Sequence, residues 1–222
     1  MKQKYKDRLL KGANNFGLGL TAQQLSYFEE FADNLIFWNR IAGITANRGI
    51  GDIVDSMFLD SLAFNILGFD ISGLKTCDFG TGGGFPGVPL KITYEKLDIS
   101  LIDSSSKKCS FLEQISKNFG FEDFSVFCER GGTSGFKSRF SSSFDLVFSR
   151  ACADTGKLVE LICPLLKQGG RLIAWKGPLW NSEIENSKQI MDEYNVSLEG
   201  YHDYSILDTE AVKTLVIIKK GF

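Results

Sequence analysis

The sequence predicts an α/β fold with a mostly parallel, seven-stranded sheet that helices cover on both faces. From about residue 74, short apolar stretches alternate with helical patterns, which is typical of βαβ units and a parallel sheet. A glycine-rich turn joins the first apolar stretch to the first of these helices. The last two extended stretches have no helical pattern between them, so we expect an antiparallel hairpin at the edge of the sheet.

We expect residues 1–70 to form a helical extension and residues 71–222 to form the sheet-containing domain. Thr21 and Gln24 fit a capping box, and apolar residues recur at helical spacing as far as about Arg40, so this segment predicts an amphipathic helix. Residues 53–67 are denser in apolar side chains and predict a second helix that packs on more than one side. The basic residues near the N-terminus could form an arm that grips RNA, although most charge runs are solvated faces.

Strands and helices are then expected in alternation. The predicted strands are residues 74–79, 97–103, 124–128, 144–149, 171–175, 196–204 and 213–219. The predicted helices begin at Val88, cover residues 111–119 before Gly120, and cover residues 158–166, with Gly169 and Gly170 closing the last one.

The composition excludes several classes of protein. Of the 222 residues, 43% are hydrophobic and 23% are charged, which is typical of a globular chain that needs no metal or disulfide for stability. The five cysteines form no C-x-x-C pair and the chain has a single histidine, so we expect no metal site and no histidine-dependent triad. Without a long apolar run or a signal-like N-terminus, we expect a cytoplasmic protein with no membrane partner. The net charge of −2 means that a polyanionic partner must meet a local basic patch.

The glycine-rich turn at residues 80–87 is the first candidate binding site. Glycine backbone can approach a ligand closely, and the amides that open the next helix supply free donors. A P-loop is excluded because Val88, and not lysine, follows the turn. The turn does fit the G-x-G-x-x-G pattern of dinucleotide-binding folds, and Asp103 stands about where those folds place an acid. The glycines that fit this pattern are Gly82, Gly84 and Gly87.

Asp78, two residues before Gly80, favours a different cofactor. An ionised carboxylate at the end of a buried strand is costly without donors, and it would repel the phosphates of a dinucleotide. A cofactor that carries an ammonium and a sulfonium but no phosphate suits a negative site better, and Asp103 could accept hydrogen bonds from its ribose hydroxyls. These properties describe S-adenosylmethionine. The alternatives are that Asp78 caps the turn, that Asp103 caps a helix, and that the glycines form a turn without a ligand.

Several short motifs occur in a fixed order between about Leu25 and Lys219. They are Trp38-Asn39, Ile44-Thr45-Ala46, Phe58-Leu59-Asp60-Ser61-Leu62, the turn from Asp78 to Leu90, Leu101-Ile102-Asp103-Ser104, Ser149-Arg150-Ala151 and Lys176-Gly177. This ordered set resembles the ribosomal RNA small subunit methyltransferase G family, also called glucose-inhibited division protein B. The resemblance implies a class I, Rossmann-like, S-adenosylmethionine-dependent methyltransferase fold that transfers a methyl group to N7 of a guanine in 16S rRNA.

The resemblance also implies which residues bind the cofactor. It places Gly80 and Phe85 in the cofactor turn, Gly131 and Gly132 beside the adenine, and Arg150 at the mouth of the site. The full set of expected cofactor-binding residues is Asp78, Gly80, Gly82, Gly84, Phe85, Asp103, Gly131, Gly132 and Arg150.

The chain departs from the family pattern at three places. Met57 stands where the family usually has histidine, and Gly43 stands where it has asparagine. Gly131 and Gly132 stand where the family has a small or apolar residue followed by glutamate, so one carboxylate near the adenine is missing.

The expected chemistry needs no general base, because guanine N7 carries an in-plane lone pair that can attack a sulfonium methyl group directly. Orientation alone can then supply most of the rate. Arg150 and Lys176 are the predicted catalytic residues, because each follows a strand parallel to that of the glycine turn and should lie at the ligand-binding edge. An arginine can hold guanine O6 or a phosphate in bidentate fashion. The alternative for both residues is a salt bridge at the end of a strand.

Other functions remain open at this point. The chain could methylate another RNA, a protein or a small molecule, could bind NAD, or could be a noncatalytic RNA-binding or assembly protein. For the favoured function, the expected partner is 16S rRNA or the small ribosomal subunit, and the expected state is a monomer.

Overall fold

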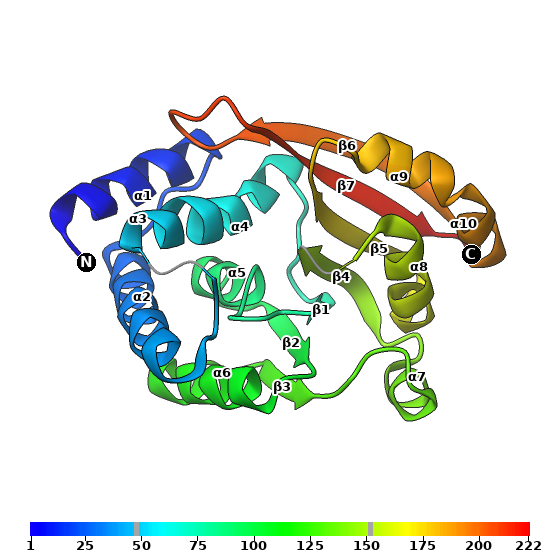
Figure 1. Cartoon of the computed structure of the whole chain (residues 1–222), viewed down its shortest axis with the longest axis horizontal. Coiled ribbons are helices and arrows are strands. Elements are labelled where there is room, and N and C mark those ends of the chain that lie inside the picture. The colour runs from blue at the N-terminus through cyan, green and yellow to red at the C-terminus, as the bar shows by residue number, and fades with distance from the viewer. Residues whose placement is uncertain (47–48, 151–152) are drawn as a thin grey trace.

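The computed structural model describes residues 1–46, 49–150 and 153–222. Within these ranges one sheet of seven strands runs through the molecule in the order β3-β2-β1-β4-β5-β7-β6 (Figure 1). The strands are β1 (Lys75–Phe79), β2 (Asp98–Asp103), β3 (Phe124–Cys128), β4 (Phe144–Arg150), β5 (Leu166–Lys176), β6 (Val196–Ser205) and β7 (Val212–Lys220). Strands β1 to β5 are parallel, and β7 pairs antiparallel with both β5 and β6, so the predicted fold and edge hairpin are confirmed.

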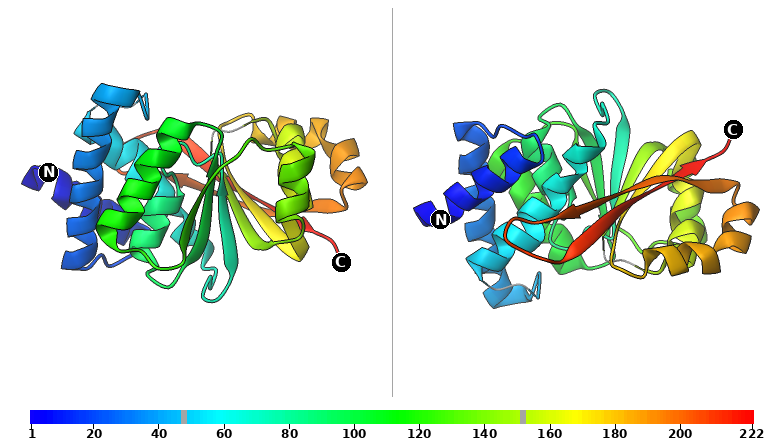
Figure 2. Two further views of the ribbon diagram at one scale, coloured as in Figure 1. Left: turned by 90° about the horizontal axis from the view of Figure 1, so that it is seen from below. Right: turned by 90° about the horizontal axis from the view of Figure 1, so that it is seen from above.

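Helices cover both faces of the sheet, which Figure 2 shows edge-on. The first layer contains α1 (Gln3–Asn15), α2 (Ala22–Ala42), α3 (Ile50–Ile53), the π-helical turn η1 (Val54–Leu59), α4 (Asp60–Leu62), the 3₁₀ turn η2 (Ala63–Leu67), α5 (Gly87–Thr93) and α6 (Ser106–Phe119). The other elements are α7 (Ser134–Phe140), α8 (Thr155–Ile162), η3 (Cys163–Leu165), α9 (Trp180–Asn186) and α10 (Lys188–Glu193). The described part of the chain thus forms three layers, with the sheet in the middle.

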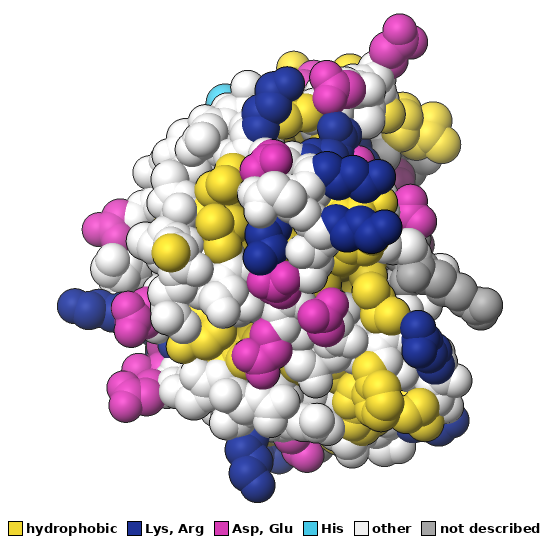
Figure 3. All heavy atoms as spheres, turned by 90° about the vertical axis from the view of Figure 1, so that its left-hand side faces the viewer, with side chains coloured by type: hydrophobic (Ala, Val, Ile, Leu, Met, Phe, Trp, Pro, Cys, Tyr) yellow, Lys and Arg dark blue, Asp and Glu magenta, His cyan; other side chains and the backbone are white. Residues whose placement is uncertain are grey.

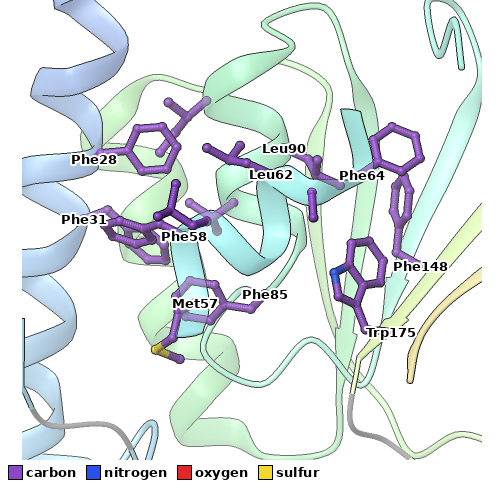
Figure 4. Close-up of a cluster of buried hydrophobic side chains, with 14 of the residues drawn as sticks. Phe28, Phe31, Met57, Phe58, Leu62, Phe64, Phe85, Leu90, Phe148 and Trp175 are labelled. Carbon is purple, nitrogen blue, oxygen red and sulfur yellow. The ribbon is translucent and has the colours of Figure 1, made fainter. Parts of the chain in front are cut away.

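Each face of the sheet has its own hydrophobic core. On the face toward the helical extension, which we call the extension face, Phe148 and Trp175 pack with Phe28, Phe58 and other buried side chains (Figure 4). On the opposite face, strand residues such as Val147 and Ala174 pack against α7, α8, α9 and α10. Successive residues of a strand point to opposite faces of the sheet. When one residue of a strand belongs to one of these two cores, the side chains next to it on the strand point toward the other face.

The helical extension agrees with the sequence in part. The predicted capping box begins α2: the Thr21 Oγ1 accepts from the Gln24 backbone N–H at 3.2 Å, and the Gln24 Oε1 accepts from the Thr21 N–H at 2.8 Å. Residues 53–67 are helical but not one regular helix, because a π turn and a 3₁₀ turn interrupt them. The division of the chain at residue 70 stays a prediction.

The expected N-terminal arm is instead a packed helix. In α1, Lys6 forms an ion pair with Glu29 at 2.7 Å, and Arg8 forms one with Asp55 at 2.6 Å. Figure 3, which views the side of the molecule that carries α1 and α2, shows acidic side chains among the basic ones. Local acids therefore neutralise part of the charge of this helix, and the expectation that it grips RNA stays a prediction.

Both boundaries of one predicted helix were wrong. The helix expected over residues 158–166 begins at Thr155 and ends at Ile162, because Pro164 lacks the N–H that would continue it. Gly169 and Gly170 do not close that helix but lie inside β5, beside a register shift between β4 and β5. Helices α7, α9 and α10 are short and were not predicted.

Candidate functional site

The glycine-rich turn follows β1 at the point where the strand order changes direction between β1 and β4, which is where open α/β sheets bind ligands. Gly80, Gly82 and Gly84 all have positive φ angles, of 72°, 59° and 93°. A Cβ on Gly84 would lie 2.6 Å from the Val88 Cγ2, so packing excludes a side chain there. A Cβ on Gly82 would meet nothing closer than the Lys108 Nζ at 3.9 Å, so this glycine faces the open side of the turn.

Asp78 lies beneath this turn and is fully buried. Its Oδ2 accepts hydrogen bonds from the Thr81 hydroxyl at 2.6 Å and from the Gly87 N–H at 2.8 Å. Its Oδ1 is buried and has no hydrogen-bond partner among the described residues. Burial raises the pKa of Asp78 to about 6, although the two hydrogen bonds and the charge of Arg150 oppose this shift. Asp78 therefore caps the turn with one oxygen and keeps the other available.

Asp103 ends β2 on the other side of the turn. Its Oδ2 accepts from the Gly82 N–H at 2.9 Å, and its Oδ1 accepts from the Ser105 N–H at 2.9 Å. The Lys108 Nζ lies 3.8 Å from the Asp103 Oδ2. Each carboxylate oxygen has a second lone pair, so this side chain could still accept from a ligand hydroxyl. The structure thus brings both predicted acids to the turn, one below it and one beside it.

Arg150 ends β4 and also reaches the turn. Its Nη1 donates to the Ser56 carbonyl at 2.7 Å and to the Asp60 Oδ2 at 3.0 Å. Its guanidinium carbon lies 5.3 Å from the centre of the Phe85 ring, a cation–π contact with the buried aromatic residue of the turn. Arg150 therefore joins the glycine-rich turn to the helical extension.

Lys176 is not part of this constellation. Arg150 is paired in register with Trp175, whose ring belongs to the extension-face core, so the next residue, Lys176, points to the opposite face. Its Nζ donates to the Ala153 carbonyl at 3.0 Å and to the Glu183 Oε2 at 2.6 Å. The structure therefore separates the two predicted catalytic residues by the thickness of the sheet.

Gly131 and Gly132 follow β3, and their surroundings explain why neither carries a side chain. A Cβ on Gly131 would lie 2.3 Å from the Phe79 Cζ and would clash with the edge of the aromatic ring. Gly132 has a φ of 86°, and a Cβ there would lie 2.9 Å from the Leu161 Cδ2. The Phe79 ring thus occupies the space of a side chain at residue 131.

The other two departures from the family pattern are also accommodated locally. Gly43 follows α2 with a φ of 62°, a conformation that asparagine also tolerates, so this change keeps the helix end. Met57 is buried in the π turn, and its sulfur accepts a weak hydrogen bond from the Thr45 hydroxyl at 3.9 Å. Ala151, which ends one of the family motifs, lies outside the described residues.

Asp60 contacts Arg150 and was not among the residues predicted for the site. The two residues are 90 apart in sequence, and no local pattern reveals such a pair. One signal was available: an acid within a densely apolar helical segment must find cationic or donor partners when it is buried.

Residues 1–46, 49–150 and 153–222 contain neither a membrane-spanning helix nor a cluster of metal-binding side chains. No helix in these ranges is long and apolar enough to cross a membrane. No group of three or more histidine, cysteine, aspartate or glutamate residues in the same ranges is arranged to hold a metal ion.

Comparisons with solved structures show the fold. The chain superposes on a [4+2]-cyclase, SpnF, with a TM-score of 0.58 and 14% identity, covering 90% of this chain and 96% of the cyclase. It superposes on a ribosomal protein L11 methylase from Lactobacillus delbrueckii subsp. bulgaricus with a TM-score of 0.56 and 16% identity, covering 81% and 83%. One of these titles names a methylase and the other a cyclase, so the fold alone does not identify the reaction.

Comparisons of sequence identify the family. Ribosomal RNA small subunit methyltransferase G from Lachnoclostridium phytofermentans is 35% identical, over 95% of this chain and 87% of the relative. The protein of the same name from Thermoanaerobacter pseudethanolicus is 34% identical, over 99% of this chain and 92% of the relative. The family model described as rRNA small subunit methyltransferase G (GidB) matches residues 24–206. The chain therefore belongs to the rRNA small subunit methyltransferase G family.

Proposed function

We propose that this protein transfers a methyl group from S-adenosylmethionine to N7 of a guanine in the 16S rRNA of the small ribosomal subunit. The observation that carries the proposal is the buried Asp78 carboxylate beneath the glycine-rich turn, with its Oδ1 unpartnered among the described residues. The family match supports the proposal along most of the chain.

The residues present fit this cofactor better than a dinucleotide. A buried carboxylate with one unpartnered oxygen can accept hydrogen bonds from a cationic group, whereas phosphates would be repelled. Asp103 has lone pairs left for the two hydroxyls of a ribose. Gly82 presents bare backbone on the open side of the turn. Gly80, Gly84 and Phe85 shape the same turn, and we assign Gly131 and Gly132 to the adenine end by family resemblance.

S-adenosylmethionine, when bound, supplies a methyl group on a positively charged sulfur. The protein's part is then to bind and orient, since guanine N7 needs no proton removed before it attacks. Asp78 and Asp103 hold the donor, while Arg150 lies next to Phe85 and carries a fixed positive charge. Such a guanidinium can hold guanine O6 or a phosphate and so align the nucleophile with the methyl group. We assign Lys176 to the support of the opposite face rather than to the reaction.

We further propose that the protein acts in the cytoplasm as a monomer. In this proposal the helical extension, residues 1–70, is a part of the site and not a separate RNA-binding module, since Ser56 and Asp60 hold Arg150.

The experiment has a binding arm and a transfer arm. Calorimetric titration with S-adenosylhomocysteine and with NAD separates the two cofactor classes. Asp103→Ala should weaken the binding of S-adenosylhomocysteine, while Asp98→Ala, at the amino end of the same strand β2, is the matched control and should not. NAD binding without a response to S-adenosylhomocysteine would overturn the proposed cofactor.

In the transfer arm, labelled S-adenosylmethionine is incubated with small subunits, naked 16S rRNA or ribosomal protein, all prepared from cells that lack this enzyme. We expect label in rRNA, and we expect chemical cleavage at 7-methylguanosine to map it to a single guanine. Label in protein, or at a position other than N7, would contradict the proposed substrate.

A further inference from the structure

The Asp60 carboxylate accepts hydrogen bonds from three side chains, and both of its oxygens have a partner. The side chain is buried, with about 4% of its surface exposed. Its Oδ2 accepts from Arg150, and its Oδ1 accepts from the Tyr204 hydroxyl at 2.6 Å and from the Lys213 Nζ at 2.8 Å. Its backbone carbonyl accepts from the Trp175 Nε1 at 2.8 Å. Strands β4, β5, β6 and β7 thus each send one side chain to this residue.

Burial of a carboxylate is expensive, and the hydrogen bonds and ion pairs around Asp60 compensate that cost. The two sides of the carboxylate differ, however. The Oδ1 side faces Tyr204 and Lys213, which come from the edge hairpin. The Oδ2 side faces Arg150, the residue that touches the cofactor turn. Tyr204 and Lys213 therefore hold the Asp60 carboxylate from the hairpin, and this carboxylate holds the Arg150 guanidinium.

The π turn η1 gives Arg150 its second acceptor. The Asp60 N–H donates to the Asp55 carbonyl, the i to i−5 pattern of a π helix, which inserts an extra residue in this turn. The Ser56 carbonyl and the Asp60 carboxylate both lie within hydrogen-bond distance of the same nitrogen, Nη1 of Arg150. With Phe85 against the guanidinium, three contacts from two segments hold one side of Arg150. Among the described residues, Nε and Nη2 have no acceptor and can face a substrate.

We propose that Asp60 is a positioning residue for methyl transfer: it holds the Arg150 guanidinium against the cofactor turn and acts on the reaction only through Arg150. This inference rests on the proposed function, because it concerns the rate of transfer to the small subunit. It assigns to the helical extension a direct part in the geometry of the site.

A double-mutant cycle tests the proposal. Asp60→Asn, Arg150→Ala and the double variant are compared with the wild type in single-turnover transfer to unmethylated small subunits, and in calorimetric titration with S-adenosylhomocysteine. We expect Asp60→Asn to slow transfer about tenfold or more, while the dissociation constant for S-adenosylhomocysteine changes less than about threefold. In the Arg150→Ala background, Asp60→Asn should slow transfer by less than about twofold further, because the residue through which it acts is gone.

Asp145→Asn is the matched control, because Asp145 lies at the amino end of the same strand β4 and pairs with Lys167, away from Arg150. It should leave transfer within about threefold of the wild type. Lys213→Met provides a second route if Asp60→Asn alone fails to fold. The formal net charge of Asp60, Arg150 and Lys213 is +1. Asp60→Asn alone raises it to +2, and adding Lys213→Met returns it to +1. The cycle is then measured in the Lys213→Met background.

The outcomes separate this inference from the proposed function. If the wild type does not methylate small subunits, the proposed function fails. If the wild type does, but Asp60→Asn slows transfer as much in the Arg150→Ala background as alone, then Asp60 acts on the fold in general and the inference is overturned. An equal loss of transfer and of S-adenosylhomocysteine binding would overturn it as well.

Discussion

Arg150 and Lys176 form two similar arrangements on opposite faces of one sheet. Each is a cation at the carboxyl end of a parallel strand, and each donates to one backbone carbonyl and one carboxylate: Ser56 and Asp60 for Arg150, and Ala153 and Glu183 for Lys176. The difference lies in what else the cation meets. Arg150 touches Phe85 in the glycine-rich turn, whereas Glu183 also accepts from the backbone N–H and the hydroxyl of Thr155, in α8.

A cation at the end of a parallel strand thus meets different groups, depending on the face of the sheet to which it points. On the extension face, Arg150 and the buried Asp78 belong to one electrostatic unit, because the charge of Arg150 lowers the pKa that burial of Asp78 raises. On the opposite face, Lys176 and Glu183 tie β5 to α9.

We expect the largest loss of methyl transfer when the Arg150 side chain is removed. Arg150→Ala should slow single-turnover methyl transfer by about 10- to 100-fold, since losing a charge-assisted contact costs about 1.5–3 kcal/mol. Lys176→Met should slow transfer less than about threefold, because its side chain lies on the other face. Rapid-quench measurements at saturating cofactor give both values, and a matching loss in Lys176→Met would show that the two faces are not functionally distinct.

Arg150→Lys refines the same test. A lysine keeps the positive charge but offers a point charge in place of a planar fork, so it should restore only part of the lost rate. Full restoration would mean that charge alone, and not geometry, matters at this position.

The second prediction concerns stability against pH on the extension face. The pKa of Asp78 is raised by burial from 3.8 to about 6, so the folded state holds this proton more tightly than the unfolded state. The contribution of Asp78 to the free energy of unfolding should therefore be largest below about pH 4. It should fall by roughly 2–3 kcal/mol as the pH rises from about 4 to about 6. Asp78→Asn should remove that fall. It should thus be at least as stable as the wild type at pH 7, yet bind S-adenosylhomocysteine more weakly.

Urea unfolding of both proteins between pH 4 and pH 8 measures this slope, and calorimetry measures the binding. An Asp78→Asn variant with an unchanged slope would mean that another group causes the pH dependence. An unchanged affinity would leave Asp78 as a structural cap of the turn.

The parts of the molecule that were predictable from the sequence have local signals. The turn at Gly84, the capping box at Thr21 and the alternation of parallel strands with helices could be anticipated because glycine patterns, caps and βαβ units operate over short distances. The Asp60 network could not, because the Asp60–Lys213 pair spans 153 residues. The position of Lys176 on the opposite face was accessible in principle, since strand alternation separates it from Arg150 once the register is known.

The third prediction concerns the packing of the Phe79 ring against Gly131 on the opposite face of the sheet. Gly131→Val should destabilise the protein by about 1–3 kcal/mol, because its Cβ would clash with the edge of the Phe79 ring. Phe79→Val should vacate that space, so the double variant should be more stable than the sum of the two single effects predicts. Chemical denaturation of the four proteins gives the coupling energy. Strict additivity would mean that the loop after β3 moves aside instead of meeting the ring.

The last prediction concerns Glu183, whose effect on the pH dependence of stability should be small and opposite in sign to that of Asp78. Burial alone would raise the pKa of Glu183, but hydrogen bonds from Lys176 and Thr155 outweigh it and lower the pKa below 4.5. A lowered carboxyl pKa means that the unfolded state binds the proton more readily, so this group stabilises the fold above its unfolded pKa and loses that contribution as the pH falls below about 4.5. Glu183→Gln should therefore flatten the loss of stability on acidification while leaving methyl transfer at pH 7 nearly unchanged. Thermal unfolding from pH 3 to pH 7 measures the first effect and single-turnover transfer the second. A wild-type acid response in Glu183→Gln would show that the Lys176–Glu183 pair adds nothing to stability, and a tenfold loss of transfer would extend the functional site to both faces of the sheet.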